Sequence, residues 1–207
     1  MIYYPINTLV KAGVKDILVV SGAEYAGDFL RLLGNGKEFG AKFTYEVQEQ
    51  PLGIADALRL AKDFSKGEKI VAILGDNIFS DNIKVFLQEF ESDKDGNAMI
   101  FLKQTPNAKR FGVAEIRKGK IHAIEEKPKK PKSKYAVTGL YFYPSDVFEV
   151  IKSLKPSKRG EYEITDVNNH YVKKGRMNGK KLRGFWSDAG TFESLFRTAK
   201  FVKENNL

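Results

Sequence analysis

The chain has 207 residues, of which 42% are apolar and 29% charged, a composition typical of an ordinary globular protein with room for one large domain. It contains no cysteine, which excludes disulfides, thiolate metal sites and a cysteine nucleophile. No apolar run is long enough to span a bilayer, and the first residues, MIYYPINTL, lack a signal-peptide pattern. We therefore expect a single domain over residues 1–207, in the cytoplasm and without membrane contacts.

The charge balance suggests an anionic partner. Lys and Arg number 35 against 26 Asp and Glu, which gives a net charge of +9 and favours either nucleic acid or a phosphorylated small molecule. Part of the excess lies in KPKKPKSK, residues 127–134, where two prolines favour a solvated loop. Nucleic acid is the less favoured partner, because the sequence has neither a paired Cys/His pattern nor the aromatic signature of an RNA-binding sheet.

Strands and helices alternate through the first half of the sequence. Apolar spacing predicts helices over 1–12, 23–34, 54–64 and 82–90, and strands over 14–20, 42–48, 70–74 and 98–103. In two of these helices it places Phe29, Leu32, Leu33, Val85, Phe86 and Phe90 toward the core. This alternation predicts an α/β fold with a mixed, mostly parallel sheet flanked by helices.

The second half follows a different pattern. Residues 111–126 predict an antiparallel hairpin with a Lys-Gly turn, and a further strand is expected over 135–143. We expect helices over 145–154, 164–174 and 192–204, the last capped by Thr191, and one strand over 180–188. The hairpin suggests a small antiparallel part beside the main sheet.

Two aspartates occupy equivalent places at strand ends. Asp76 follows the apolar run 70–74 in KIVAILGDNIF, and Asp188 lies at the end of the expected strand in FWSDAG. Open α/β sheets bind ligands beyond the carboxyl ends of their strands, and Mg²⁺ prefers carboxylate and phosphate oxygens. If the fold brings them together, these residues can hold Mg²⁺ beside a triphosphate; otherwise Asp76 caps a turn.

Further polar side chains suit phosphate and sugar. In EEKP, residues 125–128, Lys127 can hold a phosphate while Glu126 accepts hydrogen bonds from sugar hydroxyls. The alternative is an exposed, ion-paired strand end. Arg159 and Glu163 form either part of a phosphate site or a salt bridge at the start of a helix.

The segment VQEQPLG, residues 47–53, suits the edge of a nucleotide base. It ends a strand with the amide of Gln48 and contains Gly53, which permits close backbone approach, although an ordinary turn has the same composition. We expect His122 and His170 to be structural, and Tyr141 to lie in the core or line a cleft.

Taken together, these segments resemble the sugar nucleotidyltransferases, and among them the glucose-1-phosphate thymidylyltransferases. The resemblance rests on segments in one order: MIYYPINTLVKAG, LLGNG, VQEQPLGIADAL, LGDNIF, RFGVAEI, EEKPKKPKSKYAVTGLYFYP, KPSKRGEYEITDVNNHY and FWSDAGTFESL. It implies a Rossmann-like nucleotidyltransferase fold with a small sugar-binding part. It also implies Mg²⁺-dependent transfer of a nucleotidyl group from dTTP, or UTP, to glucose-1-phosphate.

The resemblance also implies roles for individual residues. Asp76 and Asp188 would be metal ligands, with Asp76 and Lys127 catalytic. Gln48 and Gly53 would contact the base. The sugar phosphate would be bound by Gly112, Glu126, Lys127, Tyr141 and Arg159. We also expect a homo-oligomer.

One departure from the family pattern concerns the N-terminal side. The family opens with a strand, a glycine-rich loop with the signature G-x-G-T-R-L and a downstream lysine, and none of these precedes Met1 in this sequence. In the family this strand lies between those that match 14–20 and 70–74. We therefore expect an imperfect sheet and little transferase activity in the chain as written. Sugar-phosphate binding without turnover is the alternative function, and nucleic-acid binding the third.

Overall fold

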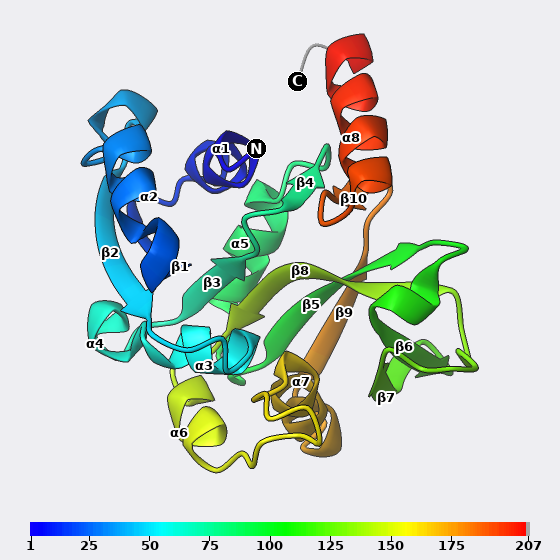
Figure 1. Ribbon diagram of the computed structural model, residues 1–207. Coiled ribbons are helices and arrows are strands. Elements are labelled where there is room, and N and C mark those ends of the chain that lie inside the picture. Colours follow the sequence, from blue (N-terminus) through cyan, green and yellow to red (C-terminus); the bar gives the residue numbers. More distant parts are fainter. Residues whose placement is uncertain (206–207) are drawn as a thin grey trace.

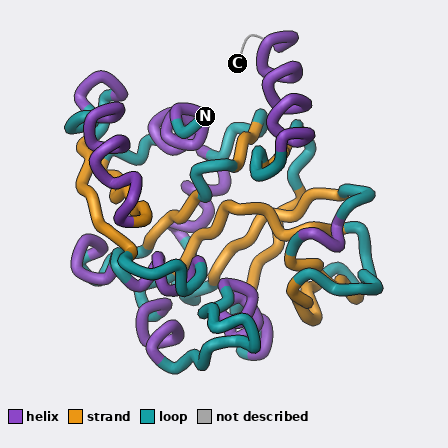
Figure 2. The backbone as a smooth tube through the Cα atoms, viewed as in Figure 1, coloured by secondary structure: helices purple, strands orange, loops and turns teal. Residues whose placement is uncertain are grey.

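The computed structural model describes residues 1–205, whose elements appear in Figures 1 and 2. The α-helices are α1 (Tyr3–Ala12), α2 (Ala26–Leu33), α3 (Ile54–Arg59), α4 (Lys62–Ser65), α5 (Lys84–Ser92), α6 (Val147–Lys152), α7 (Ile164–Lys173) and α8 (Phe192–Asn205). The strands are β1 (Asp16–Gly22), β2 (Lys42–Gln48), β3 (Ile70–Ile73), β4 (Asn77–Phe79), β5 (Ala98–Gln104), β6 (Gly112–Arg117), β7 (Lys120–Glu126), β8 (Tyr135–Tyr143), β9 (Met177–Lys181) and β10 (Trp186–Asp188). Among the described helices, none combines the length and the hydrophobicity that crossing a bilayer requires.

Strand β8 is the centre of the main sheet. Along one edge it pairs with β5, and along the other with β3 and, near its beginning, with β6. The sheet continues from β5 to β9 and from β6 to β7, the expected hairpin. The α/β class and the mixed sheet are confirmed. Parallel pairs do not predominate, however, because β8 runs antiparallel to each of its partners and only β1–β2 and β5–β9 are parallel among the described pairs.

Alternate side chains of the central strands enter two separate cores. In β8, Leu140 and Phe142 pack on one face, while Tyr141 and Tyr143 pack on the other. Strand β5 behaves in the same way, and its apolar residues from Ala98 to Leu102 are almost completely buried. Helices α1 and α5 contribute to the first core, and α3, α6 and α7 to the second, so the sheet is covered on both faces.

Two of the expected core positions are wrong. Leu32 is 53% exposed and Val85 is 67% exposed. In the second case the buried stripe of the helix is Ile83, Leu87 and Phe90, which share one face at intervals of four and three residues. Val85 lies on the opposite face of this helix. The apolar spacing indicated an amphipathic helix, but it did not decide which of the apolar residues belong to the buried face.

Two expected elements are divided in the structure. The helix over 54–64 is interrupted after α3, where Leu60 and Ala61 donate to carbonyls only three residues back, Ala57 and Leu58. The strand over 180–188 is split into β9 and β10. Between them, the carboxylate of Asp81 accepts hydrogen bonds from the backbone N–H groups of residues 183 and 184, so side chains replace a strand partner there.

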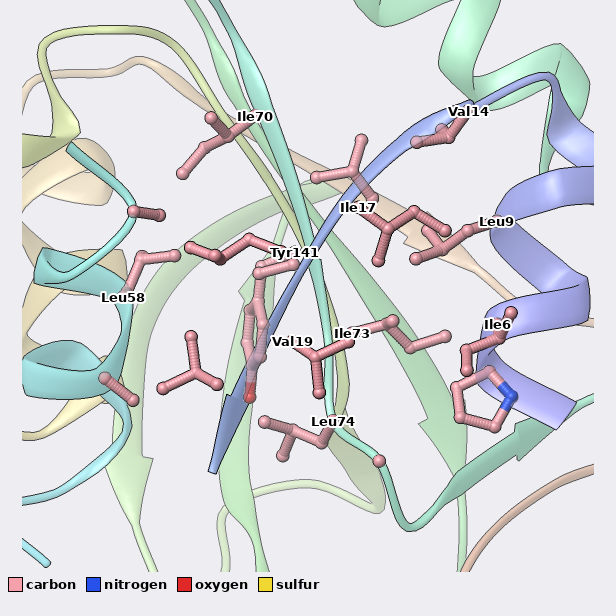
Figure 3. A pocket seen from close by; sticks show the side chains of 18 of the residues that line it. Ile6, Leu9, Val14, Ile17, Val19, Leu58, Ile70, Ile73, Leu74 and Tyr141 are labelled. Atoms are coloured by element: carbon pink, nitrogen blue, oxygen red, sulfur yellow. The ribbon is translucent and has the colours of Figure 1, made fainter. Parts of the chain in front are cut away.

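A slot separates β1 from β3. Among the described strands, β1 pairs with β2 alone and β3 with β8 alone, and the cavity between them has a volume of about 310 Å³. Its walls come from β1, β3, α1 and α3, and Figure 3 shows Val19, Ile73 and Leu58 directed into it. The expected imperfection of the sheet is therefore present, with two unpaired strand edges beside an apolar space.

A matched pair of substitutions tests whether the slot is open in solution. Ile100 is fully buried, whereas Ile73 is half-buried and lines the slot. We expect Ile100→Ala to lower the free energy of unfolding by about 2–5 kcal/mol, and Ile73→Ala by less than about 2 kcal/mol, because fewer packing contacts are lost. Urea unfolding measures both. Equal losses would show that the slot is closed in solution.

Candidate active site

The structure places Asp76 and Asp188 side by side. Strands β4 and β10 pair antiparallel, with Asn77 opposite Asp188, and the N–H of Ala189 donates to the carbonyl of Asp76 at 2.8 Å. A Cβ atom added to Gly190 would lie 3.3 Å from Oδ2 of Asp76 and 3.5 Å from Oδ2 of Asp188. The two carboxylates thus face one small space beside this glycine.

The side chain of Asn77 holds Asp76 in place through a set of hydrogen bonds. Its Nδ2 donates to Oδ1 of Asp76 at 2.7 Å, and its Oδ1 accepts from the N–H of Gly139 at 2.9 Å and from Nε1 of Trp186 at 2.7 Å. The residue is only 3% exposed. A Cβ atom on Gly139 would lie 2.7 Å from the Asn77 side chain, so that position has room only for glycine. One amide thereby joins β4, β8 and β10 and orients a carboxylate.

A cation contacts the carboxylate pair. Nη2 of Arg110 donates to Oδ2 of Asp188 at 2.8 Å. The guanidinium lies 5.4 Å from the centre of the Phe111 ring, and that ring packs edge-on against Trp186 at 5.0 Å. Asp188 is therefore neutralised by a side chain from the loop that precedes β6.

A second group of polar residues lies where β6 begins and β7 ends. Gly112 pairs with Glu126 across the hairpin, and Thr165 of α7 donates a hydrogen bond to the Glu126 carboxylate. A Cβ atom on Gly112 would lie 3.2 Å from Oγ1 of Thr165 and 3.4 Å from Oε2 of Glu126. Next to them, Lys127 is exposed and forms no ion pair with any residue between 1 and 205.

Tyr141 is buried in β8, the central strand. It is 4% exposed, and its ring stacks on Tyr143 with centroids 6.0 Å apart. Burial raises the pKa of the Tyr141 phenol well above its usual range, and the negative charges of Glu126 and Asp76 raise it further. Both carboxylates are thus close enough to act on one phenol, which stays protonated and able to donate a hydrogen bond.

Gln48 and Gly53 are brought together at the end of β2. Nε2 of Gln48 donates to the carbonyl of Gly53 at 3.1 Å and to Oδ2 of Asp56 at 2.9 Å. Gly53 has φ of +100°, and an added Cβ atom would lie 2.6 Å from the carbonyl oxygen of Tyr162. Glycine is therefore required there on conformational and steric grounds, and the Gln48 amide is held in place.

Arg159 forms a salt bridge with Glu163, one of the two alternatives that the sequence analysis gave for this pair. Its guanidinium donates to the carboxylate of Glu163 at 2.9 to 3.2 Å, directly before α7. These hydrogen bonds raise the pKa of Arg159, with smaller effects from the charges of Glu161 and Glu126. The structure thus pairs Arg159 at the start of a helix, and its contact with phosphate stays a prediction.

The carboxylate pair fits a divalent cation. No group of three or more His, Cys, Asp or Glu side chains gathers anywhere in residues 1–205, so His122 and His170 belong to no such cluster. The expected cation would contact the carboxylates of Asp76 and Asp188. Two carboxylates suffice for Mg²⁺, which usually keeps several waters and shares substrate phosphates. The oxygen donors are therefore compatible with the expected metal.

Four residues of this site were not singled out from the sequence, namely Asn77, Arg110, Thr165 and Trp186. Asn77 carried a local signal, because an amide directly after Asp76 is within reach of its carboxylate. The others act through contacts between distant segments, such as the pairs 110–188 and 126–165. No local pattern could have identified these three.

Comparisons with known proteins cover the whole described chain. The nucleotidyl transferase family profile matches residues 1–205. A glucose-1-phosphate thymidylyltransferase of Neisseria meningitidis serogroup A is 44% identical over 98% of this chain and 72% of its own length. One from Mycolicibacterium smegmatis is 43% identical over 98% of this chain and 71% of its own length.

Solved structures agree with the sequence comparisons. A protein described as a glucose-1-phosphate thymidylyltransferase from Bacillus anthracis, crystallised with sucrose, superposes with a TM-score of 0.94 at 48% identity, covering 100% of this chain and 83% of that one. A UDP-glucose pyrophosphorylase complexed with UDP-glucose gives a TM-score of 0.82 at 21% identity, covering 98% and 86%. The second likeness concerns the fold alone.

The hydrogen bonds of Asn77 give a testable prediction. Asn77→Ala leaves the N–H of Gly139 and Nε1 of Trp186 unpaired in a buried place, and each unpaired group costs about 1–3 kcal/mol. We expect a loss of about 2–5 kcal/mol in the free energy of unfolding, measured by urea denaturation. In the control, Asn82→Ala removes one exposed hydrogen bond to the N–H of Lys84 and should cost about 1 kcal/mol. Equal losses would contradict the role of Asn77.

Proposed function

The chain belongs to the nucleotidyl transferase family, and from this premise we propose that it transfers a thymidylyl group from dTTP to glucose-1-phosphate. The products are dTDP-glucose and pyrophosphate, and UTP is the alternative nucleotide. The observation that carries the proposal is that the carboxylates of Asp76 and Asp188 face one small space beside Gly190. The relatives that match the chain bear the name of this activity.

The reaction is a displacement at phosphorus. A phosphate oxygen of the sugar phosphate attacks the α-phosphorus of dTTP in line, a P–O bond forms, and the bond to the pyrophosphate oxygen breaks. Little covalent chemistry falls to the protein, so catalysis depends on positioning and on compensating negative charge. A pair of carboxylates with the guanidinium of Arg110 beside it suits this task.

We assign the parts of the site as follows. The Gln48 amide and the backbone at Gly53 contact the base. Gly112, Glu126 and Tyr141 bind the sugar, with the Tyr141 phenol as a hydrogen-bond donor. Lys127 and Arg159 neutralise its phosphate. Asp76 and Asp188 would hold Mg²⁺, which when bound neutralises phosphate charge. We further propose one domain, a cytoplasmic location and a homo-oligomer.

Binding without turnover is the second candidate function. The slot between β1 and β3 leaves an apolar space of about 310 Å³ beside β3, the strand that precedes Asp76, whereas the side chains of Glu126 and Arg159 on the sugar side are hydrogen-bonded in place. Calorimetric titration with glucose-1-phosphate and dTDP-glucose measures binding, and release of pyrophosphate measures turnover. Binding without pyrophosphate release would favour this second function, and binding of an unrelated oligonucleotide alone would contradict both.

Lys127 provides a test of the sugar side. Removal of this charge by Lys127→Ala should weaken glucose-1-phosphate binding by about 1.5–3 kcal/mol, the usual value of a hydrogen bond to a charged group. This corresponds to a 10- to 150-fold rise in Kd, roughly. Lys129→Ala, two residues along the same exposed loop, is the control and should leave Kd unchanged. An equal Kd for both variants would show that EEKP, residues 125–128, is an ordinary exposed strand end without a role in binding the sugar phosphate.

The two aspartates provide a test of catalysis. In protein that releases pyrophosphate from dTTP and glucose-1-phosphate with Mg²⁺, Asp76→Asn and Asp188→Asn should each lower kcat by about a hundredfold or more, as loss of one electrostatic group commonly does. Asp95→Asn, at an exposed aspartate before β5, should be neutral. Retention of kcat in either of the first two variants would remove that residue from the catalytic assignment.

A further inference from the structure

Arg110 holds one particular oxygen of the carboxylate pair. Its Nη2 lies 2.8 Å from Oδ2 of Asp188. The same Oδ2 atom is the one directed toward Gly190, where it and Oδ2 of Asp76 approach a common point within 3.5 and 3.3 Å. The guanidinium therefore bonds to the oxygen that a cation shared by both carboxylates would need.

We propose that Arg110 is a positioning residue that serves as the counter-cation of Asp188 and releases this carboxylate when a divalent cation binds. The inference rests on the metal role proposed above for Asp76 and Asp188. It adds a competition between a side chain and the metal for one oxygen. Metal affinity then depends on how firmly Arg110 is held.

The electrostatics favour a cation at this place. Two neighbouring carboxylates of like charge repel each other. The single charge of Arg110 relieves this repulsion. A divalent ion relieves it more, since it carries twice the charge and can contact both carboxylates. The exchange of Arg110 for a divalent ion is thus favourable whenever the ion is present at sufficient concentration.

The contact is also built to be released. Arg110 gives Asp188 one hydrogen bond and not the bidentate pair of which guanidinium groups are capable. Its side chain is 38% exposed, against 12% for Asp188. The guanidinium is already partly in water and can move further into it, while the more enclosed Asp188 stays in place.

The backbone around Arg110 is anchored on both sides. Arg110 ends the short 3-10 helix Ala108–Arg110, and the next residue, Phe111, packs on Trp186. The carbonyl of Phe111 accepts the N–H of Lys127 at 3.1 Å. Release of Asp188 therefore requires a movement of the Arg110 side chain only, and the loop itself can keep its position.

Binding of Mn²⁺ to the whole chain, without nucleotide, tests the proposal. Arg110→Gln should bind Mn²⁺ about three- to tenfold more tightly than the unaltered chain in calorimetric titration. Lys109→Gln removes the same charge from the neighbouring exposed residue, which has no contact with Asp188 among the described hydrogen bonds and ion pairs. This control should change the affinity by less than twofold. In the Asp188→Asn background, Arg110→Gln should have no effect.

A second measurement separates competition from a purely structural role. Without metal, Arg110→Gln should melt at a lower temperature than the unaltered chain, and saturating Mn²⁺ should remove this difference. A structural role alone would leave the variant less stable with and without Mn²⁺. If Arg110→Gln does not fold, Arg110→Lys replaces it. This variant should also bind Mn²⁺ more tightly than the unaltered chain.

The outcomes are distinct from those for the proposed function. Equal Mn²⁺ affinity for Arg110→Gln and Lys109→Gln, weaker binding by Arg110→Gln, or no Mn²⁺ binding at all would overturn the inference. Pyrophosphate release by the unaltered chain together with any of these results would leave the function intact. Competition at Asp188 without binding of glucose-1-phosphate would instead contradict the function and support the role of Arg110.

Discussion

The geometry of the site depends on the hydrogen bonds of the Asn77 side chain. Strands β4 and β10 form only a short two-stranded pair, and so little backbone pairing cannot by itself place a carboxylate accurately. Asn77 links this pair to β8 through the N–H of Gly139 and to the indole of Trp186. Because its remaining donor binds Asp76, the rigidity of the main sheet is transmitted directly to that carboxylate.

The sheet can supply this rigidity because its centre is buried on both sides. Alternate residues of β5 and β8 enter different cores, and each fully buried large side chain contributes about 1.5–3 kcal/mol through its removal from water. The slot between β1 and β3 lies outside this centre. The structure thus combines a tightly packed part, which carries Gly139, with a part in which two of the described strand edges lack pairing.

Local pattern predicted the bounds of several elements well. The strands 42–48 and 135–143 and the Lys-Gly hairpin turn have the predicted bounds, because alternation and turn chemistry are local properties. The class of the fold followed from the order of these elements. Failures occurred where tertiary contacts decide, as for Val85, which lies on the outer face of its helix, and for the interruption of 180–188 by Asp81.

The same distinction applies to the site. Asp76 and Asp188 could be identified because each ends an apolar strand, but their proximity depends on the pairing of β4 with β10. Arg110 and Trp186 could not be identified, since what marks them is contact with distant segments, 78 positions away for the pair 110–188 and 109 positions away for the pair 77–186. Local sequence therefore supplies candidates, and the topology selects among them.

Backbone conformation adds an independent indication at Lys127. Three residues other than glycine have positive φ, namely Lys66, Lys118 and Lys127, within the described chain. The first two are followed by glycines that also have positive φ, Gly67 and Gly119, so tight turns account for them. Lys127, with φ of 41°, is followed by a proline, and such a conformation costs energy for a residue with a Cβ atom.

Strain of this kind persists only where neighbouring structure enforces it, and it is concentrated at functional sites. At Lys127 the enforcing contacts are visible. Its N–H is held by the carbonyl of Phe111, and the buried ring of Pro128 fixes the chain on the other side. Because Phe111 also packs on Trp186, two residues before Asp188, the strained lysine and the carboxylate pair are positioned by one and the same aromatic residue.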